Sequence, residues 1–270
     1  MQACNRWRFG QGAVRIQATK ASMAPARREV GRRSAATLAH LPGRRPGRVA
    51  ALGYNRGSSS RRANSMLESR ELSAQRGAAT LFSGVDFKLV PGDALLVTGA
   101  NGSGKTTLLR IVAGLTRAAQ GTLAWRGVPV APLDPGLRAA VLYIGHAAAL
   151  KDELSTEENL ASLANLHGGD ASRDAIGGAL AAWSLDRQRA LPARALSLGQ
   201  RRRVGLARLK LVERPLWVLD EPAAALDAGG ISLLCEMLGA HLAHGGMAIV
   251  ATHQDMVLPP GHAVRSLSLP

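Results

Sequence analysis

The chain has 270 residues, a formal net charge of +15 at pH 7 and only two cysteines, Cys4 and Cys235. This length is enough for one large or two modest domains with a substantial core. Two cysteines exclude a disulfide framework or a thiolate metal site, and no uninterrupted apolar stretch approaches the roughly 18 residues that a membrane-spanning helix needs.

The positive charge is concentrated in the first 65 residues. They hold fourteen of the 34 Lys and Arg residues but only one of the 19 acidic residues, Glu29. The rest of the chain therefore carries 20 basic and 18 acidic side chains, a net charge of +2. A nearly neutral domain argues against nucleic acid as a partner, because binding to a phosphate backbone needs a basic surface.

Residues 1–65 are rich in Arg, Ala, Gly, Pro and Ser, which predicts a disordered basic extension rather than a packed core. Two interpretations compete for this segment. It resembles a mitochondrial or plastid transit peptide, because it is rich in Arg and Ser and poor in acids. Alternatively, the start codon is assigned too far upstream in a GC-rich bacterial gene, and Met66 is the true start. We favour the second interpretation, and under either one the folded domain spans 66–270.

The beginning of this domain predicts a β region followed by a buried strand. The pattern over 79–89 is typical of short strands around a turn at Ser83-Gly84. Pro91-Gly92-Asp93 then turns the chain into an apolar strand that ends at Thr98.

The most informative motif follows this strand directly and consists of Gly99, Ala100, Asn101, Gly102, Ser103, Gly104, Lys105, Thr106 and Thr107. Its three glycines allow backbone N–H groups to gather around an anion. A helix that begins near Gly104 points its positive end at the same charge. We therefore predict a bound nucleoside triphosphate, with Lys105 reaching the β- and γ-phosphates and the Thr106 hydroxyl holding Mg²⁺.

Beyond this loop the apolar periodicity alternates between helices and strands. It predicts helices over 105–114, 201–212 and 229–244, an Ala-rich helical segment over 156–193, and strands over 121–127, 141–144, 216–219 and 247–252. More specifically, we expect the segment 121–127 to be an exposed strand followed by a turn. Strands that alternate with helices after an early phosphate-binding loop predict an α/β fold with a mainly parallel sheet and an inserted helical lobe.

Two acidic residues, Asp220 and Glu221, come directly after the apolar strand 216–219. Open α/β sheets place their ligand chemistry at the carboxyl ends of the strands. Asp220 is expected to hold Mg²⁺ through water, and Glu221 to orient or deprotonate the water that attacks the γ-phosphate. Acid pairs in this position can also be turn formers, but a phosphate-binding loop in the same domain favours the catalytic interpretation.

Four segments make the pattern specific to a family: Leu196-Ser197-Leu198-Gly199-Gln200, Leu219-Asp220-Glu221-Pro222, Ala225-Leu226-Asp227 and Ala251-Thr252-His253. In this order after a phosphate-binding loop, they resemble the nucleotide-binding subunits of ABC transporters. The resemblance implies a P-loop NTPase fold of the ABC ATPase type over 66–270, with an N-terminal antiparallel β region and an α-helical lobe at about 146–214.

The same resemblance implies that ATP lies between two copies of the chain in a sandwich dimer. Ser197, Gly199 and Gln200 of one copy would contact the nucleotide held by the loop of the other, and Asp227 would link the two sites. Ser197 can also cap its own helix, and the two roles are compatible. His253 would contact the γ-phosphate. The implied catalytic residues are Lys105, Glu221 and His253, with ATP and Mg²⁺ as the required small molecules.

His146 makes the resemblance specific to one subfamily of ABC ATPases. It stands where most ABC ATPases have a Gln that senses Mg²⁺ and the γ-phosphate, so it is a candidate contact for both. Gly145-His146 in place of Pro-Gln resembles the ATP-binding subunits of cytochrome c maturation, the CcmA haem exporters. The segments 80–85 and 200–209 resemble the same subfamily.

This subfamily resemblance implies an ATP-hydrolysing subunit for haem export or delivery in cytochrome c biogenesis. It would dock on integral-membrane subunits of the CcmB and CcmC kinds through a surface around 146–159. Its location would be the cytoplasmic face of the bacterial inner membrane or, alternatively, the matrix side of the mitochondrial inner membrane. The ATPase of another small-molecule exporter and a regulatory module that binds ATP without hydrolysis are the alternative functions.

One family feature is missing from the sequence. No aromatic residue lies between Leu67 and Leu81, where ABC ATPases usually stack the adenine ring. Arg76, through its planar guanidinium, or Gln75 would have to take that role.

Overall fold

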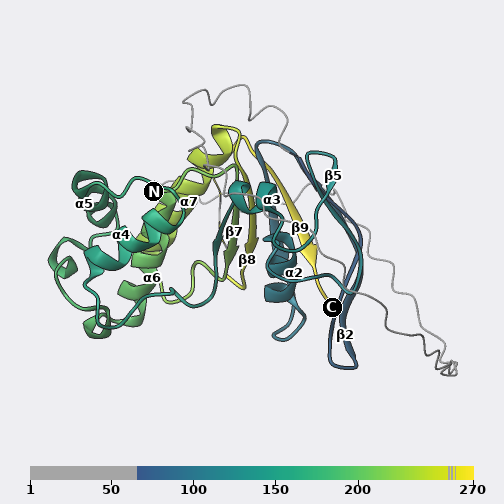
Figure 1. Ribbon diagram of the computed structural model, residues 1–270, viewed down its shortest axis with the longest axis horizontal. Coiled ribbons are helices and arrows are strands. Elements are labelled where there is room, and N and C mark those ends of the chain that lie inside the picture. Colours follow the sequence, from purple (N-terminus) through teal and green to yellow (C-terminus); the bar gives the residue numbers. More distant parts are fainter. Residues whose placement is uncertain (1–65, 255, 257, 259) are drawn as a thin grey trace, which may run out of the picture.

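The computed structural model describes residues 66–254, 256, 258 and 260–270. The expectations for residues 1–65 fall outside this part of the chain. The described part has the predicted α/β fold, in which two sheets and two groups of helices form successive layers (Figure 1).

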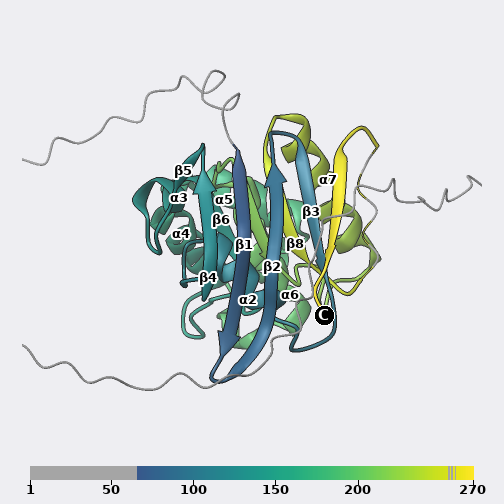
Figure 2. The same ribbon diagram turned by 90° about the vertical axis from the view of Figure 1, so that its right-hand side faces the viewer.

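The first sheet is antiparallel and has four strands in the order β2-β1-β4-β5 (Figure 2). The strands are β1 (Leu67–Arg76), β2 (Ala79–Leu89), β4 (Gln120–Trp125) and β5 (Val128–Pro129). Each of its neighbouring pairs is antiparallel. The predicted N-terminal antiparallel β region is therefore confirmed.

The second sheet has five strands in the order β6-β7-β8-β3-β9, and every neighbouring pair is parallel. The strands are β3 (Asp93–Thr98), β6 (Val141–Ile144), β7 (Leu216–Asp220), β8 (Met247–Ala251) and β9 (Ala263–Ser268). Because β8 pairs with both β3 and β7, the carboxyl ends of these three strands lie at the same edge of the sheet. This edge is where doubly wound sheets bind ligands.

The helices cover both faces of the parallel sheet. α2 (Lys105–Val112) lies between the two sheets, and α3 (Pro135–Ala140) leads into β6. α4 (Thr156–Leu166), α5 (Arg173–Ala182), α6 (Leu198–Ala207) and α7 (Ala228–Ala243) lie on the opposite face (Figure 1). Short 3₁₀ turns occupy Asp186–Gln188, Ala193–Ala195 and Arg208–Lys210. In the described part of the chain, no helix combines the length and apolarity needed to cross a membrane.

Side-chain alternation along the parallel strands divides the core in two. Leu95 and Val218 pack with α2 and the antiparallel sheet, whereas Leu96 and Leu219 pack with the helices of the other face. Successive residues of a strand point to opposite faces. Strands buried on both faces read as continuous apolar runs, which explains why the sequence revealed them so clearly.

Two strand predictions were wrong in the antiparallel sheet. β2 is one continuous strand, and Ser83-Gly84 forms a bulge opposite the single residue Ser73, with φ 64° at Gly84. A bulge and a turn both use a glycine with positive φ, so the sequence could not separate them. The prediction of an exposed β4 was wrong for the second half of the strand: Gln120, Gly121 and Thr122 are exposed, whereas Leu123 and Trp125 are buried.

Two further elements differ from the predictions. The helix expected to begin at 201 begins at Leu198 and is followed by a 3₁₀ turn from Arg208. β9 was not predicted at all, because it is an edge strand in which Leu267 is the only buried residue. A strand with so few buried residues leaves little trace in the apolar pattern.

Candidate active site

The loop between β3 and α2 has the backbone that a phosphate cradle needs. Gly99, Gly102 and Gly104 have φ values of 141°, 88° and 98°, which favour glycine. A Cβ atom at Gly99 would lie 2.7 Å from the carbonyl oxygen of Leu269, and one at Gly104 would lie 2.9 Å from the Phe82 ring. α2 begins after Gly104 without a side-chain cap, so its positive end is open to an anion.

Lys105 lies in the centre of this loop. Its side chain is buried, and Nζ donates to the carbonyl oxygens of Gly99 at 2.9 Å and Ala100 at 3.0 Å. Neutral carbonyls satisfy an ammonium less well than an anion does, so phosphate oxygens would be stronger partners. Of the other loop residues, Asn101 is exposed, and Ser103 is buried with no hydrogen-bond partner for its Oγ atom.

Thr106 and Asp220 meet at the carboxyl edge of the sheet. Thr106 Oγ1 donates to Asp220 Oδ1 at 3.2 Å. Asp220 is 1% exposed, and its Oδ2 atom is buried without a hydrogen-bond partner among the described residues. Hydroxyl and carboxylate oxygens are the ligands that Mg²⁺ prefers, and an unpartnered carboxylate oxygen favours such a cation.

His146, the third predicted metal residue, is not part of this pair. Its imidazole is exposed and makes no hydrogen bond or ion pair within the described chain. Only its backbone is engaged, because its carbonyl oxygen accepts a hydrogen bond from Arg202 at 3.1 Å. No group of three or more His, Cys, Asp and Glu side chains with metal-binding geometry occurs in the described residues.

Glu221 and His253 come together from the ends of two neighbouring strands. His253 Nε2 lies 3.2 Å from Glu221 Oε1, and the His253 backbone N–H donates to Glu221 Oε2 at 3.3 Å. The Glu221 N–H donates to the carbonyl oxygen of Ala251 at 2.9 Å. The structure thus places the predicted catalytic acid against the predicted γ-phosphate contact.

The segment before α6 uses its polar groups to cap the helix. Ser197 Oγ accepts from the Gln200 N–H at 3.2 Å, and the Ser197 N–H donates to Gln200 Oε1 at 2.9 Å, a reciprocal capping box. A Cβ atom at Gly199 would lie 2.7 Å from the Ala225 carbonyl oxygen, so glycine permits this close approach. Leu198, where many family members have glycine, is 75% exposed.

Asp227 caps α7 and also contacts α6. Its side chain accepts from the Gly230 N–H at 2.8 Å and pairs with Arg203 at 2.6 Å. The Gly230 N–H and the Arg203 guanidinium together lower the pKa of Asp227. The segment 197–203 therefore lies against the segment 225–227.

The predicted site residues consequently form two clusters in one chain. Loop 99–107, Asp220, Glu221 and His253 make up the first, and the segments 197–200 and 225–227 make up the second. Among the described residues, no hydrogen bond or ion pair joins residues 197–200 or 227 to loop 99–107. A single chain brings together the groups for binding a triphosphate, but it does not bring the second cluster to them.

Arg202 was not predicted from the sequence. This residue of α6 is 4% exposed and bonds backbone carbonyls at the end of β7 and in the segment after β6. A signal for its burial was available, because Arg202 shares a helical face with Leu206 and Leu209, both buried.

A model of the ABC transporter family matches residues 82–224, from β2 to just beyond Glu221. The chain belongs to the ABC transporter family. As an ABC ATPase it binds ATP. It is 48% identical over 200 residues to the cytochrome c biogenesis ATP-binding export protein CcmA of Cupriavidus necator, a match that covers 74% of this chain and 87% of the relative.

Solved structures of the ABC transporter family share the fold. An ATP-binding subunit of an ABC transporter is 27% identical and superimposes with a TM-score of 0.61, covering 70% of this chain and 79% of its own. An ATP-binding cassette captured as a dimer in a post-hydrolysis state with ADP and Pi is 23% identical, with a TM-score of 0.60 over 70% of this chain and 88% of its own. The latter likeness establishes the fold alone.

Proposed function

We propose that this chain is the ATP-hydrolysing subunit of a membrane complex that exports or delivers haem in cytochrome c biogenesis. The observation that carries the proposal is the cluster at the carboxyl edge of the parallel sheet, where Glu221 touches His253 and Asp220 touches Thr106. Similarity to the CcmA protein supports the role in cytochrome c biogenesis. A regulatory module without turnover is less consistent with this intact set of groups.

Binding would begin at the phosphate loop. The backbone N–H groups of 99–107 and the positive end of α2 would surround the β- and γ-phosphates. Lys105 Nζ would exchange the carbonyl oxygens of Gly99 and Ala100 for phosphate oxygens. Fixed donors of this kind stabilise the charge of the transferring group without reorganisation at the moment of reaction.

Magnesium fits the donor set at the neighbouring position. The Thr106 hydroxyl and the Asp220 carboxylate would hold the ion, which would neutralise phosphate charge there. We keep His146 as a proposed contact to nucleotide or metal, because its backbone is fixed close to the end of β7 by Arg202.

Glu221 would position the attacking water and accept its proton during in-line attack on the γ-phosphate. His253 already contacts both oxygens of this carboxylate, one through its ring and one through its backbone. The imidazole would turn from Glu221 to the γ-phosphate once ATP is bound.

A second copy of the chain would complete the site. Ser197, Gly199 and Gln200 lie at the start of α6 and, among the described residues, make no hydrogen bond or ion pair with their own phosphate loop. Asp227 lies next to this segment at the surface. These groups are therefore available to the nucleotide of another copy. The N-terminus of α6 also has the partial positive charge of a helix dipole, which would stabilise a γ-phosphate.

The adenine site would lie at the end of the β1–β2 hairpin. Leu81 and Phe82 of β2 are next to Gly104, and the exposed residues Gln75 and Arg76 pair with Thr80 and Ala79 at that end. Arg76 would cover the base with its planar guanidinium.

The surface for membrane partners would be the segment 146–159. Asn159 shapes this segment from inside: its amide accepts from the Lys151 N–H at 2.8 Å and donates to the carbonyls of Lys151, Leu154 and Ser155. Arg201 of α6 pairs with Asp152. A segment fixed to α4 and α6 in this way can transmit movement, and CcmB-like and CcmC-like subunits at the cytoplasmic face of the bacterial inner membrane are the proposed partners.

The test replaces the proposed base. Glu221→Gln should abolish ATP hydrolysis while leaving ATP binding intact, because the amide cannot accept the proton. An ATPase assay should show no turnover by this variant. Light scattering in the presence of Mg²⁺-ATP should show that it accumulates as a dimer. The same variant should fail to restore haem-containing cytochrome c in a bacterium that lacks its own maturation ATPase.

Glu213→Gln is the matched control. It makes the same chemical change at an exposed residue just before β7, at the other end of that strand. It should hydrolyse ATP and restore cytochrome c as the unaltered chain does. ATP hydrolysis by Glu221→Gln would show that Glu221 is not the general base. Failure of the unaltered chain to restore cytochrome c would favour a function as the ATPase of another small-molecule exporter.

A further inference from the structure

Arg202 makes an unusual number of contacts for a buried charged side chain. A guanidinium has five N–H donors, and five backbone carbonyls accept from it. Nε donates to Pro222 at 3.2 Å, and the two terminal nitrogens donate to Gly145 (2.8 Å), His146 (3.1 Å), Asp220 (2.7 Å) and Glu221 (2.6 Å). All five N–H groups of the Arg202 side chain therefore donate to backbone carbonyls.

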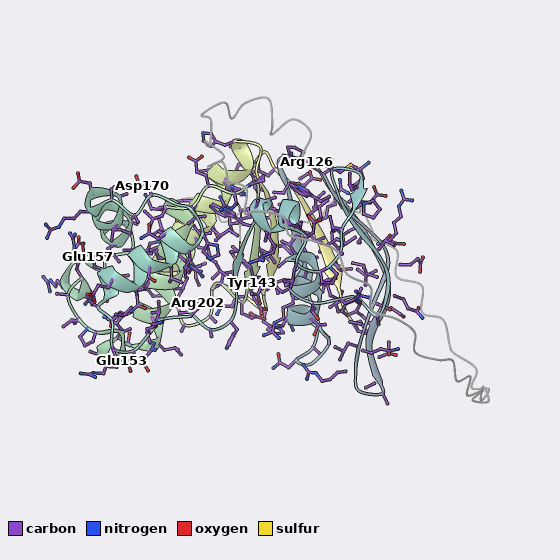
Figure 3. The ribbon with its side chains drawn as sticks, in the orientation of Figure 1. Arg126, Tyr143, Glu153, Glu157, Asp170 and Arg202 are labelled. Carbon is purple, nitrogen blue, oxygen red and sulfur yellow. The ribbon has the colours of Figure 1, made fainter. Side chains whose placement is uncertain are left out.

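These carbonyls belong to segments that are distant in sequence. Arg202 is part of α6, Gly145 and His146 follow β6, and Asp220 to Pro222 end β7. Figure 3 shows Arg202 between the helices and the parallel sheet. One side chain thus ties the helix that Ser197 caps to the backbone that carries both acids of the site.

The backbone held by Arg202 is strained. Glu221 has φ 50°, in the left-handed region that residues with a side chain rarely adopt. Such conformations persist only where the surroundings enforce them. Arg202 bonds the three successive carbonyls of Asp220, Glu221 and Pro222, and the Glu221 N–H is held by Ala251.

Arg202 also leaves the two carboxylates to other partners, because Thr106 donates to Asp220 and His253 contacts Glu221. Arg202 bonds no carboxylate, so Asp220 Oδ2 stays without a hydrogen-bond partner in the described part of the chain. Burial lowers the pKa of Arg202, and the charges of Asp220 and Glu221 act in the opposite direction. The guanidinium fixes the main chain of the two acids while their side chains remain available for other ligands.

We propose that Arg202 is a positioning residue that makes the placement of Glu221 and Asp220 depend on the position of α6. The inference rests on the proposed function, since it assigns Arg202 to the same hydrolytic site. Any shift of α6, whose first residues are offered to a second copy, would move the guanidinium and release the strained turn at Glu221. Hydrolysis would then proceed only while α6 holds the position seen here.

A lysine at position 202 cannot make the same set of hydrogen bonds to backbone carbonyls. Its ammonium has three donors on one nitrogen, whereas the planar guanidinium reaches carbonyls on three sides. Arg202→Lys should therefore keep the positive charge but lower kcat for ATP hydrolysis about tenfold or more, because small misplacement of a catalytic group has effects of this size. The dissociation constant for ATP should stay within about twofold, because the phosphate loop is untouched.

Arg70→Lys is the matched control. It makes the same chemical change at an exposed residue of β1, which pairs with Glu68 at the surface. Its kcat and its ATP affinity should equal those of the unaltered chain. Thermal unfolding midpoints of both variants identify any loss of folding, and activity is expressed per folded molecule.

The outcomes separate this inference from the proposed function. No hydrolysis by the unaltered chain defeats the proposed function itself. Hydrolysis by the unaltered chain together with an unchanged kcat in folded Arg202→Lys overturns the inference, as does a parallel loss of kcat, ATP affinity and thermal stability. If Arg202→Lys does not fold, Arg202→Gln is judged by the same criteria. If neither variant folds, Arg202 serves folding and the inference is overturned.

Discussion

At the scale of single residues, the glycines of the phosphate loop serve different physical needs. Gly102 needs only its positive φ, because a Cβ atom there would meet nothing within 4 Å. Gly104 needs both its positive φ and the absence of a side chain, since a Cβ atom would lie 2.9 Å from the Phe82 ring. The Phe82 side chain is buried and has little room to move aside.

This difference predicts unequal effects of the same substitution. Gly102→Ala should lower the free energy of unfolding by about 1–2 kcal/mol, the cost of a left-handed backbone for alanine. Gly104→Ala should lower it further, because overpacking against Phe82 adds about 1–3 kcal/mol. Urea denaturation of the two variants measures both values. Equal losses would show that the contact with Phe82 relaxes without cost.

At the scale of elements, two helices begin with the same device. α4 starts with Ser155 and Glu158, α6 with Ser197 and Gln200, and both pairs form a capping box. Each box satisfies N–H groups that the first helical turn leaves free. Only the box of α6 lies in the segment proposed to face a second nucleotide.

Alanine at the two caps separates capping from nucleotide contact. Ser155→Ala and Ser197→Ala should each lower the free energy of unfolding by about 1 kcal/mol through loss of the cap. Only Ser197→Ala should also lower the rate of ATP hydrolysis per folded molecule. Chemical denaturation and a steady-state ATPase assay measure the two effects. Equal rates of ATP hydrolysis by the two variants would show that Ser197 acts only as a helix cap.

At the scale of the whole molecule, the two described cores are built from the segment that follows the basic extension. Both clusters, one on each face of the parallel sheet, are built from residues between Leu67 and Leu269. Residues 1–65 also hold +13 of the net charge of +15, and the rest of the chain carries +2. We therefore expect the domain to fold and to hydrolyse ATP without residues 1–65.

Removal of residues 1–65 should leave folding and catalysis intact. The thermal unfolding midpoint should be unchanged within error, and kcat for ATP hydrolysis should stay within about twofold, because no site residue is removed. Differential scanning calorimetry and an ATPase assay on both chains measure these quantities. A marked loss of thermal stability would mean that the extension packs on the domain.

The local motifs could be identified from the amino-acid sequence alone. Loop 99–107 and the acids after β7 were found because a strand, a turn and a helix follow one another within a few residues, and local backbone geometry dictates the residue types. The parallel strands were found because they are buried on both faces. The ordered motifs were also enough to indicate the family.

Contacts between distant segments became visible only in the three-dimensional fold. The contact of Glu221 with His253 joins the ends of two strands, and Arg202 reaches carbonyls up to 57 positions away. β9 is held by its pairing with β3, across the whole length of the domain. Periodicity and spacing describe neighbours along the chain, whereas these contacts arise from strand order and from packing of α6 on the sheet. For that reason the phosphate-binding loop could be predicted from the sequence, and the hydrogen bonds of Arg202 to the backbone around Glu221 could not.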